Sequence, residues 1–304
     1  MFKFDHLELA RIIGEPRDPR RPYPLLVEKL CDTDTADPNE YVYQFDVLLD
    51  TDKVISTVAS GMTTTAVTPD TPALLSFTDL ATDEYWVKIT DLANAKERTL
   101  GRKKATINRA MNAEENYQIV QLLDAAAITA GNLNDLRSGE TTFTYSHLID
   151  MIDQVIDYSE NYVLTCGTQI DKDIKLWDFK DNKYHSMIEA FNDLGIEVVR
   201  INQSVTRDGA ATNVLASTRA YLAGTVTEKP GKPLLFVRKR MNEIERLGGV
   251  ISESGDQAER LVFVNPNPVI VSSTRHLAVA IVGYEQYVAA TQNLYAISRF
   301  IRSV

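Results

Sequence analysis

The residues that could do chemistry are few and widely spaced in this 304-residue chain. None of the histidines has a second histidine or a cysteine at the spacing of a metal site: His6, His147, His185 and His276. The two cysteines, Cys31 and Cys166, form no CxxC pair. We therefore expect surface or packing roles for the histidines, no metal, and no catalytic thiol at Cys166.

Three carboxylates share one side of a predicted helix: Asp150, Asp153 and Asp157. Paired carboxylates perform acid–base catalysis or bind cations in many proteins. These three fall opposite the apolar face of the helix, so we expect them to form a solvated surface. The stretch Asp171-Lys172-Asp173 indicates a short, solvated acidic loop.

The stretch GTVTEKPGK, from Gly224 to Lys232, is superficially similar to a phosphate-binding loop. Its glycines are too far apart, and Pro233 stands where such a loop needs Ser or Thr to coordinate magnesium. The chain contains no GxGxxG motif, and Ser254-Gly255 does not form a GxSxG elbow. We therefore expect no cofactor and no enzymatic activity.

The composition is that of a globular protein, with 44% hydrophobic and 24% charged residues. A formal net charge of −10 argues against a protein that grips nucleic acid through its phosphates. The basic clusters Arg17–Arg21 and Arg238–Arg240 are short, and we expect solvated faces or ion pairs there. No run approaches 18 apolar residues, so we expect no transmembrane helix.

The element that must position everything else is a long helix within Glu97–Ala130. Its apolar residues form one stripe: Ile107, Ala110, Met111, Ile119, Leu122, Leu123 and Ala126. Its charged residues fall largely off that stripe: Arg102, Lys103, Lys104, Glu114, Glu115 and Asp124. A helix from Gly101 to a stop at Gly131-Asn132 would be roughly 44 Å long.

Two segments before this helix are predicted to be arms. Residues 1–40 are charged, rich in proline and poor in core residues, so we expect another subunit to hold them in place. Thr51–Thr82 is dense in Thr and Val, carries few charges and has turn signals at Pro69–Pro72. It is predicted to form a long β-hairpin, or alternatively a bent pair of strands within an ordinary sheet.

The rest of the chain alternates helical and strand patterns, which is typical of an α/β domain. Helices are predicted at Thr144–Ser159, with Thr144 as N-cap, and at Lys183–Leu194. The predicted strands are Tyr41–Leu49, Tyr85–Ile89, Tyr162–Cys166, Ile196–Ile201, Pro233–Val237, Leu261–Val264 and Val269–Ser272, with further strands in Leu277–Ile301.

This order of parts resembles the major capsid proteins of tailed bacteriophages, which have the Hong Kong 97-like capsid fold. The resemblance rests on an N-terminal arm, a low-charge β arm, a long helix, an α/β domain and closing strands. The C-terminal stretch AVAIVGYEQYVAATQNLYAISRF is similar in character to the C-terminal end of that family.

The resemblance implies an α+β Hong Kong 97-like capsid fold with an N-terminal arm, an extended β-hairpin E-loop, a long spine helix, a P-domain and an α/β A-domain. By position, the parts would be the arm at 1–40, the E-loop with its flanking strands at 41–96, the P-domain with the spine helix at 97–160, the A-domain at 161–262, and a return to P-domain strands at 263–304.

The resemblance also implies a self-assembling structural protein whose hexamers and pentamers form an icosahedral shell around double-stranded DNA. The partners would be further copies of the chain, with scaffolding, portal or decoration proteins as additional candidates. DNA would be enclosed without sequence-specific binding, and no membrane would be involved. The location would be the virion capsid, assembled in the host cytoplasm.

On the hairpin arm, we expect the exposed apolar residues to anchor the subunit interface: Met62, Leu74, Leu75 and Phe77. Lys53 and Lys88 flank the arm, but nothing marks either lysine as reactive, so we expect no isopeptide crosslink. The alternatives are a different cage such as a nanocompartment shell, an oligomeric α/β enzyme with a dispersed site, and a phage tail or neck protein.

Overall fold

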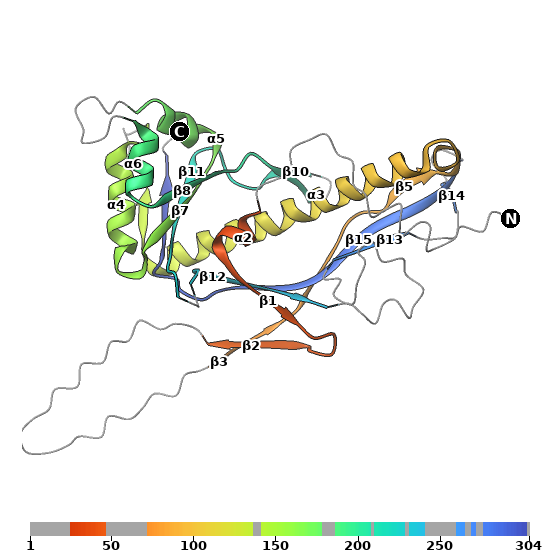
Figure 1. Cartoon of the computed structure of the whole chain (residues 1–304), viewed down its shortest axis with the longest axis horizontal. Helices are drawn as coiled ribbons and strands as arrows, with labels where there is room; N and C mark the ends of the chain where they lie inside the picture. The colour runs from red at the N-terminus through yellow and green to blue at the C-terminus, as the bar shows by residue number, and fades with distance from the viewer. Residues whose placement is uncertain are drawn as a thin grey trace, which may run out of the picture.

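The structure, a computed structural model, describes residues 25–46, 72–135, 141–177, 186–207, 210–228, 231–240, 260–264, 269–271 and 276–302. These residues form a seven-stranded sheet, a five-stranded sheet and two separate strand pairs. One long helix, α3 (Ile89–Ala130), runs along the long axis of the molecule and contacts both larger sheets (Figure 1). The subunit is therefore elongated around one helix.

Helix α3 confirms the predicted long helix and extends it. It has 42 residues, which corresponds to about 63 Å. The helix ends at Gly131, which adopts a left-handed φ of 78° that favours glycine. The prediction of a start near Gly101 was wrong because α3 begins at Ile89, directly after strand β5 (Tyr85–Lys88). The apolar stripe begins only at Ile107, so the pattern gave no sign of the first turns.

The side of α3 that is buried is wider than the sequence indicated. The stripe residues Ile107, Ile119 and Leu123 are fully buried, as predicted. Lys104 and Glu115 were expected off the stripe, yet Lys104 is 5% exposed and Glu115 is 0% exposed. At Glu115, this side of the helix faces Arg238 and Arg260 of two strands and not solvent.

The seven-stranded sheet is organised around its longest strand, β15 (His276–Thr291). Five strands pair with β15 in antiparallel fashion, namely β4 (Thr78–Ala81), β5 (Tyr85–Lys88), β12 (Leu234–Lys239), β13 (Arg260–Val264) and β14 (Val269–Val271). Tyr287 pairs with both β12 and β4, so these two strands lie on opposite sides of β15. The predicted closing strands of the C-terminal region are confirmed.

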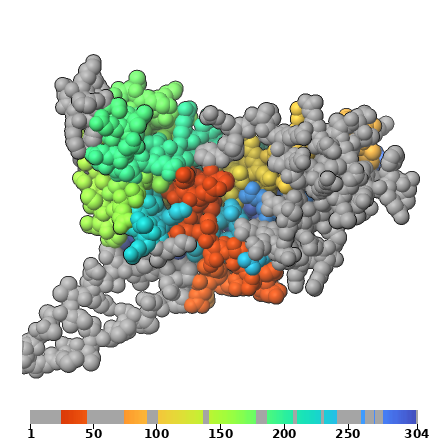
Figure 2. Space-filling model, viewed as in Figure 1, coloured from red at the N-terminus to blue at the C-terminus, as the bar shows by residue number. Residues whose placement is uncertain are grey.

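Part of the expected N-terminal arm belongs to the core of its own subunit. Helix α2 (Leu26–Leu30) leads into β1 (Cys31–Ala36), which pairs in parallel with β12. Leu26, Leu30 and Cys31 are at most 1% exposed. The expectation that another subunit holds this stretch was therefore wrong for residues 25–36. Figure 2 shows α2, β1 and β2 (Val42–Asp46) in red at the surface beside the cyan of β12. Residues 1–24 lie outside the described residues.

The five-stranded sheet has the strand order β6-β16-β11-β7-β8. Its members are β6 (Leu133–Asp135), β7 (Asn161–Cys166), β8 (Ile196–Arg200), β11 (Arg219–Thr225) and β16 (Ile297–Ile301). A separate hairpin consists of β9 (Ser204–Arg207) and β10 (Ala210–Asn213). Strands β7 and β8 are parallel, and β16 returns from the end of the chain to pair with β11. This sheet confirms the predicted α/β region.

Helix α4 (Tyr145–Val155) packs its apolar face on the five-stranded sheet and confirms the predicted helix. It continues as a short 3₁₀ helix at Ile156–Tyr158, and α6 (Met187–Asp193) lies nearby. The expected acidic loop is instead helix α5 (Thr168–Lys175). In α5, Asp171 and Asp173 are 8% and 6% exposed, so the expectation of solvated groups was wrong.

The two buried carboxylates of α5 tie together distant parts of the chain. Asp173 Oδ2 accepts a hydrogen bond from the Phe143 backbone N at 3.0 Å, and Arg302 lies 3.4 Å from it. Asp171 Oδ2 is 2.8 Å from Lys175 Nζ and 3.0 Å from Arg200 Nη1. A charge that is both paired and hydrogen-bonded is tolerated in a protein interior, which explains why these acids are not at the surface.

Candidate interaction surface

The residues that suggested chemistry are structural in the part of the chain that the structure describes. Cys166 is fully buried, and this burial, with Asp171 nearby, raises the pKa of the thiol to about 12. His147 accepts a hydrogen bond from the Thr144 backbone N at 3.1 Å and so helps to cap α4. The Thr144 hydroxyl also lies 2.8 Å from His147 Nδ1, as part of the same cap. His6, His185 and Ser254 lie outside the described residues.

The three helical carboxylates are exposed, as predicted: Asp150, Asp153 and Asp157. Within the described ranges, no group of three or more His, Cys, Asp or Glu residues could hold a metal ion. Each helix in those ranges is too short or too polar to cross a bilayer.

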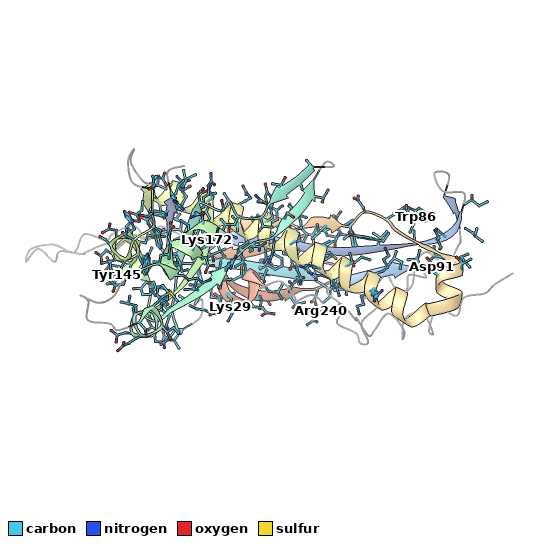
Figure 3. The ribbon with its side chains drawn as sticks, turned by 90° about the horizontal axis from the view of Figure 1, so that it is seen from above. Lys29, Trp86, Asp91, Tyr145, Lys172 and Arg240 are labelled. Carbon is cyan, nitrogen blue, oxygen red and sulfur yellow. The ribbon has the colours of Figure 1, made fainter. Side chains whose placement is uncertain are left out.

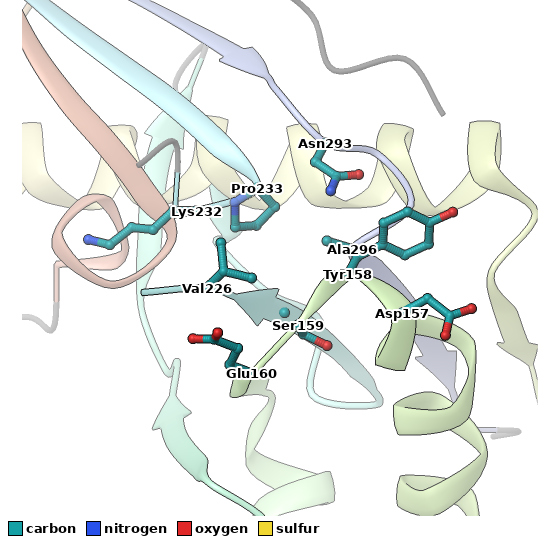
Figure 4. Close-up of a pocket in the computed structure, with 11 residues that line it drawn as sticks. Asp157, Tyr158, Ser159, Glu160, Val226, Lys232, Pro233, Asn293 and Ala296 are labelled. Atoms are coloured by element: carbon teal, nitrogen blue, oxygen red, sulfur yellow. The ribbon is translucent and has the colours of Figure 1, made fainter. Parts of the chain in front are cut away.

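The cavity in Figure 4 has a volume of about 320 Å³ and lies where the Gly224–Lys232 stretch meets the end of α4. The charged residues that line it are Asp157, Glu160 and Lys232. The Lys232 ammonium donates to the Glu28 carbonyl at 2.5 Å, and Asp157 lies on the opposite side of the cavity (Figure 4). Catalytic groups converge on one point, and these charged groups do not.

Exposed apolar residues also occur on a β-structure, the ribbon formed by β2 (Val42–Asp46) and β3 (Pro72–Ser76). Tyr43 pairs with Leu75, and Gln44 pairs with Leu74. Because successive side chains of a strand alternate between faces, Tyr43 and Leu75 lie on one face and Leu74 lies on the other with Val42. The ribbon therefore has two distinct faces.

The inner face of the ribbon packs on its own subunit. Tyr43 and Leu75, with Phe77, contact the buried residues Ala36, Leu235, Val237 and Val288. The Tyr43 hydroxyl donates a hydrogen bond to Asp34 of β1. Burial and this carboxylate raise the pKa of Tyr43 to about 12. The ribbon is thus fixed to the large sheet through β1.

A buried lysine fixes the edge of the ribbon. Lys239 of β12 is 7% exposed, and its ammonium lies 5.0 Å from the centre of the Tyr41 ring and 5.5 Å from that of Phe77. An ammonium over an aromatic face is attracted by the electrons of the ring. Lys239 belongs to the basic cluster Arg238–Arg240. It contacts aromatic side chains and is therefore not part of a solvated basic face.

The outer face of the ribbon is open, and two of its exposed side chains are apolar. Leu74 is 66% exposed and Val42 is 45% exposed, and their partners on the same face are the polar residues Gln44 and Ser76. Single exposed apolar residues are common, whereas several on one small face mark a surface for interaction. We take this outer face as the candidate interaction surface.

Other exposed apolar residues include two pairs elsewhere on the subunit. Ile270 of β14 and Leu277 of β15 are direct cross-strand partners, 67% and 45% exposed. In the α/β region, Leu176 and Ile188 are 81% and 67% exposed. Figure 3 shows that the molecule is long: Trp86, in the sheet near β14, lies at one end and Tyr145 of α4 at the other.

The expected anchors Leu74, Leu75 and Phe77 differ in their surroundings, and their role at an interface stays a prediction. Leu74 points away from the subunit, whereas Leu75 and Phe77 are half-buried against it. Met62 lies outside the described residues. The sequence did not single out Val42 as exposed, because it alternates with the equally apolar Tyr43 and either face could have been the covered one.

No family model matches this sequence, and no curated protein matches it. Solved structures do match along nearly the whole chain. The capsid structure of the cyanophage P-SCSP1u is 10% identical, covers 94% of this chain and 90% of its own, and has a TM-score of 0.57. The asymmetric unit of the bacteriophage PhiM1 mature capsid is 9% identical, with coverage of 99% and 90% and a TM-score of 0.53.

A virus-like particle from Pyrococcus furiosus is also similar. It is 11% identical, covers 99% of this chain and 100% of its own, and has a TM-score of 0.52. The chain thus has a mixed α+β fold of the class found in phage capsid proteins. These matches therefore support the fold class that the sequence resemblance implied.

Proposed function

We propose that this chain is the major capsid protein of a tailed phage, a structural subunit that self-assembles into an icosahedral shell around double-stranded DNA. The observation that carries the proposal is the match to capsid structures over 94–99% of this chain and 90% of theirs. A match over most of both chains is a likeness of the general arrangement and not of one shared motif.

The domain plan that we propose keeps the expected parts but moves α4 and β16 from the P-domain to the A-domain, and β12 from the A-domain to the P-domain. Helix α3 would be the spine, and the seven-stranded sheet with α3 would form the P-domain. The five-stranded sheet with α4, α5 and α6 would form the A-domain. The β2–β3 ribbon would be the base of the E-loop, whose remainder, residues 47–71, lies outside the described residues. Residues 1–24 would be the N-terminal arm.

Exposed apolar residues support heterologous assembly. Some of them lie on the ribbon, at the Ile270–Leu277 strand pair and beside α5, which are separate places on the subunit. Contact between two different surfaces of neighbouring copies generates rings, and rings that curve can close a shell. We therefore propose hexamers and pentamers of this chain as its main partners, with scaffolding, portal and decoration proteins as further partners.

Enclosure of DNA by this subunit would not involve tight binding. The formal net charge of −10 supplies no excess of cations to neutralise phosphates. The genome would then be retained by the closed shell, without recognition of its sequence. The expected location is the virion capsid, after assembly in the host cytoplasm.

A structural role is favoured over a dispersed enzyme site. An enzyme would place titratable groups with perturbed pKa values in a pocket. Glu285 has a raised pKa, yet it lines neither the cavity in Figure 4 nor a second cavity of about 610 Å³ beside α3. Hydrogen bonds from Thr227 lower the pKa of Glu160 in the first cavity, and burial raises the pKa of Tyr85 in the second. These directions keep Glu160 ionised and Tyr85 neutral near pH 7, so neither group is poised for proton transfer. We therefore propose that the protein acts through its surfaces.

Electron microscopy of the purified full-length protein tests the proposal. We expect closed shells of uniform diameter under assembly conditions. A monomer or dimer that persists at every protein and salt concentration, with or without crowding agents, would refute a shell role. A cage other than a capsid is the second candidate, because the P. furiosus match is a virus-like particle. Particles from the native source that contain no nucleic acid would favour that candidate.

A further inference from the structure

Four charged side chains are buried together between α3 and the seven-stranded sheet. They come from four different elements: Glu115 from α3, Arg238 from β12, Arg260 from β13 and Glu285 from β15. Both glutamates are 0% exposed, and the side chains of Arg238 and Arg260 are 21% and 16% exposed. Buried charges are costly, so their arrangement requires an explanation.

The arginines bridge the helix to the sheet through one oxygen of each glutamate. Glu115 Oε1 accepts from Arg238 Nη2 at 2.7 Å and lies 2.9 Å from Arg260 Nη2. Glu285 Oε2 accepts from Arg260 Nε at 2.7 Å. Arg260 also donates to the Asn112 side chain of α3 at 2.6 Å. The cluster therefore joins α3 to three strands of the sheet.

The second oxygen of each glutamate has no hydrogen-bond partner among the described residues. These atoms are Glu115 Oε2 and Glu285 Oε1, and both are buried. An ionised carboxylate only accepts hydrogen bonds, so two ionised glutamates cannot satisfy each other. A proton on Glu285 converts one of its oxygens into a donor, and a carboxyl group that donates to a carboxylate satisfies both unpartnered atoms at once.

Water has little access to this cluster. Glu285 lies on the same face of β15 as Gly283, where α3 approaches so closely that a Cβ atom would collide with Ile107 and Met111. Strand β4 also pairs with β15 and places Leu80 opposite Glu285. Burial and the neighbouring Glu115 raise the pKa of Glu285 to about 7. Burial alone would raise the pKa of Glu115 too, but Arg260 and Arg238 hold it below its usual range.

We propose that Glu115 and Glu285 share one proton and form a proton-dependent clamp between α3 and the seven-stranded sheet. In the closed state, the Glu285 hydroxyl donates to the Glu115 carboxylate. When the pH rises, the proton leaves to solvent, and two carboxylates then face each other across a dry contact. Their repulsion weakens the attachment of α3 to the sheet.

The charged groups that act on Glu285 set the direction of this change. They are Glu115, Arg260 and Arg238. The pKa of Glu285 is about 7 in the native state, against an ordinary value of 4.5. Between pH 4.5 and about pH 7, the native state therefore binds more protons than the open state. The clamp is therefore firm below this window and is lost as the pH rises through it. From pH 6 to pH 8, the equilibrium constant for opening should rise about tenfold.

Hydrogen exchange of the full-length protein measures this opening. We expect exchange of α3 amides beside the cluster, corrected for the intrinsic pH effect, to speed up about tenfold from pH 6 to pH 8. Glu285→Gln supplies an amide N–H donor in place of the proton, so its exchange should not change with pH. Asp150→Asn removes an exposed carboxylate and should keep the wild-type pH dependence. Equal exchange at both pH values in the wild type would overturn the proposal.

A second measurement needs no variant and covers the case in which Glu285→Gln fails to fold. Infrared difference spectra of the wild type should show one protonated carboxyl band at pH 6 that is lost at pH 8. No such band at pH 6 would also overturn the proposal. The clamp belongs to a single subunit, so the test is independent of whether the protein forms shells.

Discussion

Truncation of Leu74 should weaken assembly and leave the subunit intact. Leu74 is 66% exposed on the outer face of the ribbon. Full burial of a leucine side chain contributes about 1.5–3 kcal/mol. Burial of the exposed two thirds against a neighbouring copy would therefore contribute about 1–2 kcal/mol per subunit. Leu74→Ala removes most of this contribution, so the critical concentration for assembly should rise about 5- to 30-fold.

The assay is the critical concentration of shell formation, measured by light scattering and sedimentation over a dilution series. The matched control is Leu75→Ala, because Leu75 is the next residue and faces the opposite way, toward the buried Val237 and Val288. Leu75→Ala should lower the free energy of unfolding of the subunit by about 1–3 kcal/mol, below the fully buried range because the site is only half-buried. Leu74→Ala should leave that free energy unchanged.

Two outcomes would refute this reasoning. Assembly of Leu74→Ala at the wild-type critical concentration would exclude the outer face as a contact surface. A loss of subunit stability in Leu74→Ala as large as that in Leu75→Ala would mean that the two faces of the ribbon are assigned wrongly.

Three further predictions concern the subunit. Gly283→Val should destabilise it by about 1–3 kcal/mol in chemical denaturation, because the new side chain meets α3, and an unchanged midpoint would contradict the close approach. Asp173→Asn should lower the free energy of unfolding by about 1–3 kcal/mol in the same measurement, because it weakens the bonds to Phe143 and Arg302. A variant as stable as the wild type would mean that these bonds contribute nothing. The free energy of unfolding should fall by about 2–3 kcal/mol as the pH rises from 4.5 to about 7, because the raised pKa of Glu285 makes the native state bind an extra proton. The variant Glu285→Gln should lack this part of the pH dependence.

The parts of the fold that were predicted correctly carry strong local patterns. Helix α4 has a capping residue at Thr144 and a regular apolar face, and α3 has a stripe from Ile107 onward. Helix α5 was missed because it has only eight residues and two acids that suggest a loop. Its one local signal is the pair Ile170 and Ile174, both buried and four residues apart.

The features that were missed depend on residues far apart in the chain. Strand β1 pairs with β12, which begins at Leu234, so nothing near Cys31 indicated that this stretch completes a sheet. Glu115 bonds Arg238 across 123 positions. A local pattern assigns such a glutamate to the solvent side, because a charge is expected there unless its partner is known. The outer face of the ribbon could not be predicted for the same reason. Which of its two faces is exposed depends on the packing of the other face against distant strands.

The ribbon joins folding and assembly in one short element. Its inner face is held by Tyr43 to β1 and by Leu75 to the large sheet, so the ribbon takes its position when the subunit folds. Its outer face is then presented in a fixed orientation. A surface that is already ordered loses little conformational entropy on binding, so even a small apolar contact contributes its free energy to assembly. When the same weak contact recurs in every subunit of a closed shell, many small contributions stabilise the whole, and each remains weak enough to correct a misplaced subunit.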